Sequence, residues 1–262
     1  MSAHRGPSRG RASGFTLTEL AVVVAILALI LGGVVMTMGA MTNAREVEQT
    51  QQQLNQAREA LVGFFLRNGR FPCPAVPAVP GAGAGVESPA GGGVCTNPYN
   101  GFLPAATLGI GPTDPQGYLL DAWGNRIRYA VSQYVHTPPY VDAATCTGDA
   151  RRCYLFTTTN ALAQVGISNL AATLPELRVC DVANCAGALV FRTPAVMFST
   201  GRNFASVGAP GVDEQENITV VDDKFVAHET RPTGAVAGEF DDLVSWISPN
   251  ILYNRLIAAG AI

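Results

Sequence analysis

The feature that most constrains this chain is a long run without any charged side chain. No Asp, Glu, Lys or Arg occurs in residues 20–44, and between Leu20 and Met41 only Thr37 is neither apolar nor glycine. A helix of this length and apolarity is long enough to cross the hydrocarbon core of a bilayer. The run therefore predicts a single membrane span near the N-terminus.

The residues before this run carry positive charge only. Arg5, Arg9 and Arg11 precede it, and residues 1–14 contain no acidic residue. By the positive-inside rule the N-terminus stays in the cytoplasm, and everything after the span lies outside it. A secretory signal peptide also starts with basic residues, but its apolar core is only about 7–15 residues long and a small-residue cleavage site follows it. Neither property is found here.

Overall composition excludes several other classes of protein. Charged residues make up 14% of the chain, against roughly 25% in an average soluble domain, and hydrophobic residues make up 48%. A disordered chain would instead be polar and rich in charge. The formal net charge of −3 argues against a nucleic-acid-binding protein held by bulk positive charge. A single-span protein with one large outer domain remains.

A distinctive motif, Gly14-Phe15-Thr16-Leu17-Thr18-Glu19, lies at the start of the apolar run. A carboxylate at this place is costly, so Glu19 is expected to have a functional partner, and we expect none nearby in its own chain. The motif resembles the processing site of type IV prepilins and of the related pseudopilins of type II secretion. In that family a membrane peptidase cuts after the glycine and the new N-terminal phenylalanine is N-methylated. The retained glutamate pairs with the N-terminal ammonium of a neighbouring subunit.

The resemblance implies roles for three residues. It implies cleavage between Gly14 and Phe15, N-methylation of Phe15, and a role for Glu19 in assembly. The implied partners are homologous pilin or pseudopilin subunits, the prepilin peptidase/methyltransferase and an inner-membrane assembly platform. Cleavage would remove three arginines and no acidic residue, which changes the formal net charge from −3 to −6. The alternative is an ordinary signal anchor whose Glu19 reaches the lipid headgroups.

The chain is expected to divide into a leader (1–14), a transmembrane and stem helix (15–70) and a globular head (71–262). Residues 41–70 lack proline and favour a helix. Gly69 and Pro72 then indicate where it ends. The apolar positions of the stem follow a helical spacing and predict one buried stripe: Val47, Leu54, Ala57, Leu61, Phe64 and Phe65.

The head is predicted to be a mainly antiparallel β-sheet, which with the long helix makes a loop-rich α+β, pilin-like fold stabilised by disulfides. Residues 121–129 form an Asp-x-Trp-Gly-Asn stretch similar to one in type II secretion pseudopilins, and we interpret it as a tight turn with Trp123 covering the sheet. A helix is expected at 249–259, capped by Ser248. Strands are expected at residues 127–131, 154–158, 177–180, 189–192, 196–199, 218–221 and 240–247.

Six cysteines follow the predicted span, on the side expected to be oxidising. An even number of cysteines there predicts disulfides, and sequence neighbours suggest the pairs Cys73–Cys95, Cys146–Cys153 and Cys180–Cys185, among fifteen pairings that six cysteines allow. A zinc site is the alternative, but the chain has no Cys-x-x-Cys and few histidines.

Acidic residues gather near the C-terminus. Major pseudopilins bind calcium through a C-terminal acidic loop, and this resemblance makes Asp213, Asp222, Asp223, Asp241 and Asp242 candidate ligands. No EF-hand spacing occurs, and we favour a solvated acidic face without a metal or other cofactor. The full set of acidic residues is Asp213, Glu214, Glu216, Asp222, Asp223, Glu239, Asp241 and Asp242.

Two functions are compatible with these patterns. Gly-x-Ser-x-Gly occurs only at residues 6–10, inside the expected leader, and the chain has no His-Glu-x-x-His motif, so we expect no enzyme. We expect a structural subunit, a minor pilin or a pseudopilin, that starts in the bacterial inner membrane with its head in the periplasm and then joins a periplasmic or surface filament. The alternative is a monomeric, membrane-anchored extracytoplasmic domain for binding or adhesion. The sequence does not separate a pilus from a type II secretion filament.

Overall fold

The structure, a computed structural model, describes residues 16–77, 85–133, 156–157, 176–205, 211–219 and 222–261. The chain divides into two compact units, Met1–Arg45 and Glu46–Ile262. They are described separately below.

The first unit holds the beginning of helix α1, which extends over Leu17–Asn68. Apolar side chains in this part of the helix, such as Leu20, Ile26 and Leu29, are exposed. Within the residues that the structure describes, no helix has the length and apolarity of a membrane span.

The second unit begins with the remainder of α1, whose buried side chains form most of the expected stripe, whereas Val47 and Phe64 are only half-buried. Leu54, Ala57, Leu61 and Phe65 are almost fully buried at helical spacing. Thr50, one turn before Leu54, is also fully buried. The apolar pattern did not include it because its side chain is polar. The helix ends at Asn68, as expected.

Gly69 ends this helix through its backbone conformation. It has a φ of +68°, in the left-handed region that glycine adopts without the steric cost of a Cβ. Its amide donates to the carbonyl of Phe65 at 2.8 Å, which satisfies one of the carbonyls left free at the helix end.

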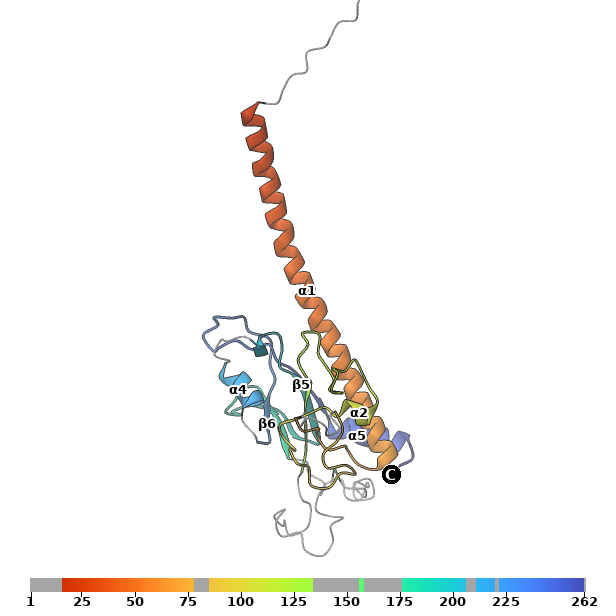
Figure 1. Ribbon diagram of the computed structural model, residues 1–262. Coiled ribbons are helices and arrows are strands. Elements are labelled where there is room, and N and C mark those ends of the chain that lie inside the picture. The colour runs from red at the N-terminus through yellow and green to blue at the C-terminus, as the bar shows by residue number, and fades with distance from the viewer. Residues whose placement is uncertain are drawn as a thin grey trace, which may run out of the picture. The chain divides into compact units, whose positions relative to one another are not determined.

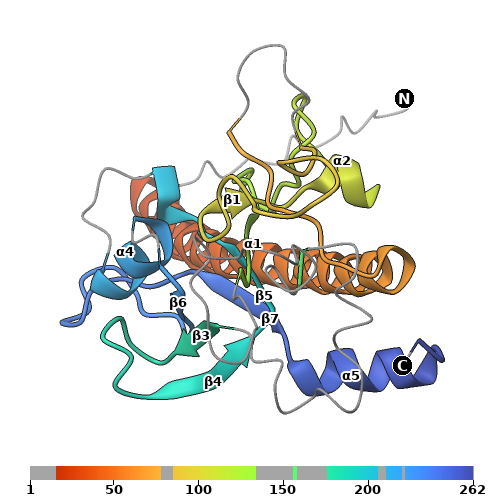
Figure 2. The same cartoon turned by 90° about the horizontal axis from the view of Figure 1, so that it is seen from below.

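Four strands form the central sheet, in the order β1-β2-β5-β7 and with every neighbouring pair antiparallel. Their bounds are β1 Gly101–Phe102, β2 Arg128–Val131, β5 Ala195–Ser199 and β7 Leu243–Ile247. Figure 2 shows β5 and β7 between α1 on one side and β3 and β4 on the other.

A second sheet has the order β4-β3-β6. Strands β3 (Leu177–Cys180) and β4 (Ala188–Thr193) are antiparallel, whereas β3 and β6 (Lys224–Val226) are parallel. The α+β fold with mainly antiparallel strands is therefore confirmed, with one parallel pair that the sequence pattern did not indicate.

Strand β5 is buried on both faces because the central sheet has a core on each side. Ala195 and Met197 face the core shared with the stem helix, while Val196 and Phe198 face the core shared with the second sheet. This arrangement explains why the residues of the strand are almost all apolar and do not alternate between apolar and polar. The C-terminal half of α1, β5 and β6 can be followed in Figure 1.

Short helices complete the head: α2 (Ala105–Leu108), η4 (Asn203–Ala205), α4 (Val212–Ile218) and α5 (Pro249–Ala258). Helix α5 confirms the expected C-terminal helix, with Pro249 at its first turn, although the Ser248 side chain makes no capping hydrogen bond.

Three expected strands differ in the structure. The expectation for residues 218–221 was wrong at Ile218, which is the last residue of α4. In this helix Glu214 and Asn217 are buried against polar partners. The apolar residues of the segment, from which a strand was predicted, do not indicate those partners. The strand expected at 240–247 begins only at Leu243, because the Asp241 carboxylate before it accepts hydrogen bonds from the amides of Arg202 and Asn203. Of residues 154–158, only Phe156 and Thr157 are described, and they form a turn.

Two disulfides are present among the described residues, Cys73–Cys95 and Cys180–Cys185, and both match the expected pairs. They are short-range links, across 22 and 5 residues of sequence. Each holds an irregular segment of the head. Cys146 and Cys153 lie outside the described residues.

Candidate functional site

Helix α1 begins with a reciprocal pair of hydrogen bonds between Thr16 and Glu19. The Thr16 amide donates to Glu19 Oε2 at 2.9 Å, and the Glu19 amide donates to Thr16 Oγ1 at 3.3 Å. The Thr16 hydroxyl also donates to Glu19 Oε2 at 2.9 Å. This is a capping box, in which the first-turn glutamate and the N-cap threonine satisfy each other's free amides.

The capping box corrects one expectation from the sequence. We expected no partner for Glu19 in its own chain, but Thr16 supplies one. The Thr-x-x-Glu spacing of a capping box is present in the sequence. The expectation failed because it considered only charged partners for Glu19. Gly14 and Phe15 lie outside the described residues.

The Asp-x-Trp-Gly-Asn stretch forms a turn built around the Asp121 carboxylate. Its Oδ1 accepts from the amides of Trp123 at 3.0 Å and Asn125 at 2.7 Å, and its Oδ2 accepts from the Ser199 hydroxyl at 2.6 Å. Burial raises the pKa of Asp121 even though these hydrogen bonds oppose the shift. The turn is thereby fixed to the end of β5.

The same turn is also bound to the stem helix. Trp123 Nε1 donates to Glu46 Oε2 at 3.0 Å, and the Ala122 amide donates to Thr50 Oγ1 at 3.1 Å. The tight turn that we expected is present. Its role is to connect the stem helix to the sheet, through a hydrogen bond of Trp123 that the sequence did not predict.

The acidic residues near the C-terminus do not form one solvated face, because Asp213, Glu214, Glu216 and Asp242 are buried. That expectation was wrong, since spacing along the chain does not indicate which carboxylates turn inward. Seven of the eight acidic residues, all except Glu239, fall into two sets that differ in their partners.

One set is neutralised by basic side chains. Asp213 accepts from Arg231 and, at 3.2 Å, from His228 Nε2. Lys224 Nζ lies 2.8 Å from Glu216 and 3.0 Å from Asp222. Asp223 pairs with Arg178 at 2.8 Å. Three of the five candidate calcium ligands, Asp213, Asp222 and Asp223, therefore belong to ion pairs.

The other set comprises Glu214, Asp241 and Asp242, which we call the carboxylate cluster. Each offers an oxygen, and these oxygens all lie within 4.8 Å of one another. Glu214 is on α4, and the two aspartates immediately precede β7. The cluster thus keeps two of the predicted calcium candidates and adds Glu214, which was not among them.

Electrostatics at the carboxylate cluster favour proton uptake by the aspartates when no cation is present. Burial, with the nearby charges of Glu214 and Glu239, raises the pKa of Asp241 to about 6. Burial, with the charges of Glu214 and Asp241, raises the pKa of Asp242 well above its usual value. Carboxylates in this situation take either a proton or a cation.

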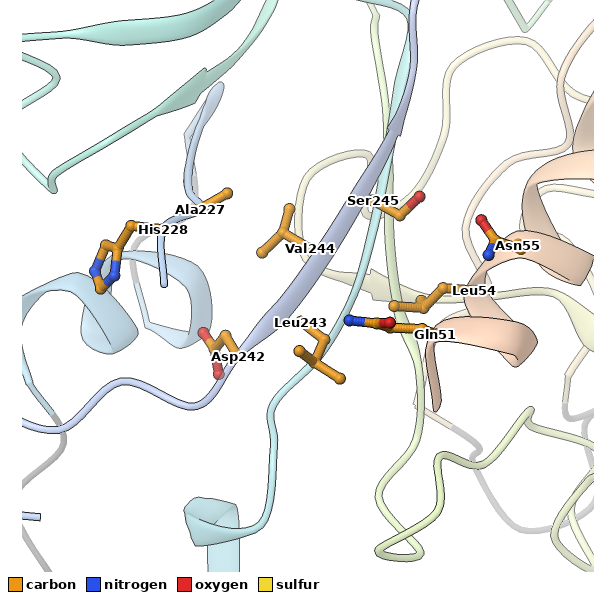
Figure 3. A pocket seen from close by; sticks show the side chains of 9 residues that line it. All are labelled: Gln51, Leu54, Asn55, Ala227, His228, Asp242, Leu243, Val244 and Ser245. Atoms are coloured by element: carbon orange, nitrogen blue, oxygen red, sulfur yellow. The ribbon is translucent and has the colours of Figure 1, made fainter. Parts of the chain in front are cut away.

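A cleft of about 350 Å³ lies next to the cluster, between the stem helix and β7. Figure 3 shows Asp242 and His228 on one side of it and Gln51 and Asn55 of α1 on the other. Its lining is largely polar, with Ser245 on the strand between them. The remaining lining residues are Leu54, Ala227, Leu243 and Val244.

Comparison with known proteins bears on the N-terminus. The family model of the prokaryotic N-terminal methylation motif matches residues 9–35. The N-terminus of the chain carries a prokaryotic N-terminal methylation motif. This motif is the hallmark of the prepilins of type IV pilins and pseudopilins, and the matched residues include Gly14, Phe15 and Glu19.

The other two comparisons found no match. No curated protein and no solved structure matches the chain. The family that carries this motif is structural and assembles with other pilin subunits after processing. The head is therefore described from its own geometry.

Proposed function

We propose that this protein is a prepilin, the precursor of a structural subunit, a minor pilin or a pseudopilin, of a type IV pilus or type II secretion filament. The observation that carries the proposal is the methylation motif at residues 9–35, which overlaps the uncharged run of residues 20–44. The subunit is cleaved between Gly14 and Phe15, is N-methylated on Phe15, and assembles through its N-terminal helix. We do not assign it an enzymatic activity.

Topology follows from the same residues. The precursor lies in the bacterial inner membrane as a single-pass protein, with its N-terminus in the cytoplasm and its head in the periplasm. The peptidase removes the three arginines that held this topology, and the assembly platform transfers the subunit into a filament. In that filament Glu19 pairs with the new ammonium on Phe15 of a neighbouring subunit, which offsets the cost of a carboxylate at the edge of the bilayer.

Mass spectrometry of the chain purified from cells with and without the prepilin peptidase tests this proposal. With the peptidase, we expect a mature chain that lacks residues 1–14 and begins with N-methylated Phe15. Without it, we expect the full-length precursor. An intact or differently cut N-terminus in both strains would overturn the proposal and favour the monomeric, membrane-anchored binding domain.

The type of filament requires a genetic test. Deleting the gene and scoring twitching motility and DNA uptake against protein secretion separates the two systems. Similarity of residues 121–125 to pseudopilins favours a secretion defect, and the large head favours a minor subunit in either system.

A further inference from the structure

Strand β7 is the last strand of the central sheet, so one of its edges has no neighbouring strand among the described residues. A free edge presents unpaired amides and carbonyls that pair readily with other chains. Proteins usually block such edges with very short strands, charged residues, proline or β-bulges. β7 has five uncharged residues, no proline and a regular register with β5. None of the usual blocking features is present in it.

The other three sheet edges in the described part of the chain are blocked. β1 has only two residues. β6 has three, and one of them is Lys224. The pairing of β4 with β3 contains two register shifts, which interrupt the regular spacing of its backbone groups. The edge of β7 is therefore the one described edge that is suited to pairing.

Pairing within the central sheet shows which backbone groups of β7 are already used. In an antiparallel ladder the amide and carbonyl of one residue point to the same side, and that side alternates along the strand. The Pro194 carbonyl, just before β5, accepts from the Ser132 amide, just after β2, at 2.8 Å. Three residues later, Met197 therefore points to the other neighbour, β7, where its partner is Ser245. Ser245 thus exchanges its hydrogen bonds with β5.

Val244 and Trp246, on either side of Ser245, consequently point their amides and carbonyls to the free edge. No hydrogen bond of the described turns and loops, and no isolated bridge, involves these groups. Both residues are only half-buried, so the edge is not covered by the rest of the described head. Two residues of β7 are therefore available to a further strand.

The cleft of about 350 Å³ lies around this free edge, because its lining comes from both faces of β7. Leu243 packs against the core shared with the stem helix, whereas Val244 and Ala227 pack against the core shared with the second sheet. Figure 3 shows Gln51 and Asn55 of α1 on the side of β7 that is opposite to Ala227. An added strand would find side chains to contact on each of its two faces.

We propose that the free edge of β7 binds an extended segment of another polypeptide, which adds a fifth strand to the central sheet. In this mode of recognition main-chain hydrogen bonds give affinity, and contacts of alternate side chains give specificity. Val244 and Trp246 supply the main-chain groups. The amides of Gln51 and Asn55 suit polar side chains on one face of the segment, and Ala227 suits small apolar side chains on the other.

Charge at one end of the cleft adds a further requirement for the segment. Asp242 lines the cleft directly before β7 and belongs to the carboxylate cluster. Within the described residues, no Lys, Arg or His side chain forms an ion pair with any member of this cluster. Complementary charge favours and orients association. The bound segment therefore carries a basic residue at the end that lies next to Asp242.

The occupant is a single extended segment and not the same edge of a second copy. The edge of β7 lies in a cleft, between α1 on one side and residues 227–228 on the other. In a symmetric pair of copies the same surface of both must meet. Two edges that are each recessed in a cleft would be kept apart by the flanks of both clefts, whereas one extended chain enters between them.

Binding of synthetic peptides to the full chain in detergent, followed by fluorescence anisotropy, tests the proposal. The probe is a short peptide in which valine and threonine alternate between two terminal lysines. One control peptide has N-methylated amides, which keep the side chains and remove the main-chain donors, and another ends in glutamates. The variant Ser245→Lys places a charged side chain in the cleft. Phe191→Lys makes a similar change at the exposed edge strand β4 and is the matched control.

We expect saturable binding of the lysine peptide, at least tenfold weaker binding of both control peptides, and at least tenfold weaker binding to Ser245→Lys. Phe191→Lys should bind as the wild type does. No saturable binding of the lysine peptide, or equal binding of the N-methylated peptide, would overturn the proposal. Equal binding to Ser245→Lys would place the peptide elsewhere and overturn it as well.

Hydrogen exchange of the wild type gives a second test that needs no variant. In the free chain, the amides of Val244 and Trp246 should exchange faster than those of Ser245 and Ile247, and the lysine peptide should slow the first two at least tenfold. Protection of Val244 and Trp246 in a free chain that is dimeric would show a second copy at this edge and contradict the proposal. Because the site lies in the head and needs no cleavage after Gly14, its failure would leave the proposed function untouched.

Discussion

Arg70 and Glu87 form a buried, two-pronged ion pair in which Arg70 Nη1 and Nη2 each lie 2.7 Å from a Glu87 oxygen. Their side chains are only 7% and 9% exposed. Glu87 Oε2 also accepts from the amide of Cys73 at 3.2 Å, next to the Cys73–Cys95 disulfide. The segment that follows the stem helix is thereby fixed to the loop-rich start of the head.

Replacing Glu87 by Gln should strongly destabilise the head, because the guanidinium of Arg70 would remain buried without a counter-charge. We expect the free energy of unfolding to fall by about 3–5 kcal/mol, as measured by urea denaturation of the full chain in detergent. The control is Glu59→Gln, which breaks an exposed pair with Arg255 and should cost less than about 1 kcal/mol. Similar losses in both variants would contradict this interpretation.

The hydrogen bond from Trp123 to Glu46 should be measurable as a coupling between the turn and the stem helix. In a double-mutant cycle, Trp123→Phe and Glu46→Ala should show a coupling free energy of about 0.5–1.5 kcal/mol. Trp246 lies in the opposite core, so Trp246→Phe combined with Glu46→Ala should be additive within about 0.5 kcal/mol. Additivity of the first pair would show that the bond contributes nothing.

Asp114 should make the stability of the head depend on acid pH. Burial alone would raise the pKa of Asp114, but the amides of Tyr118 and Gln116 and the Arg126 guanidinium outweigh burial and hold the pKa below its usual value. A carboxyl with a lowered folded-state pKa stabilises the protein above its unfolded pKa of about 3.9, and this contribution is lost as the pH falls through the folded value.

The difference in unfolding free energy between the wild type and Asp114→Asn should therefore be largest between about pH 5 and 7 and shrink below about pH 4. Urea denaturation across this range measures it. A difference that stays constant down to pH 2 would mean that the charge of Asp114 is not what stabilises the folded state.

Glu19 has two roles that substitutions can separate, given the proposed function. Gln is also a capping-box residue, so Glu19→Gln keeps the hydrogen bonds at the start of the helix and removes only the charge. We expect it to insert into the membrane but not to enter filaments. Thr16→Ala weakens the cap and keeps the charge, and it should still be incorporated. Immunoblots of membranes and sheared filaments measure both, and incorporation of Glu19→Gln would refute the proposed pairing with Phe15.

Much of this protein follows from local patterns in its sequence. The offset of Glu19 from Gly14 and the uncharged run indicated the N-terminal methylation motif that the family model matches at residues 9–35. The helical spacing of Leu54 and Leu61 predicted the buried stripe of the stem, because a single periodicity decides which face of a helix is buried. The disulfides Cys73–Cys95 and Cys180–Cys185 could also be predicted, because the two cysteines of each pair are close in the chain.

Only the tertiary structure brought Glu214 to Asp241 and Asp242, because α4 and the start of β7 are distant in sequence and pack together through Asn203 and Asn217. It also paired β3 with β6 in parallel and directed Trp123 to the stem helix. Acidic side chains look alike in sequence. Whether each one turns inward, and whether a basic side chain meets it there, depends on how distant elements pack, so only the fold separates an ion pair from a candidate cation site.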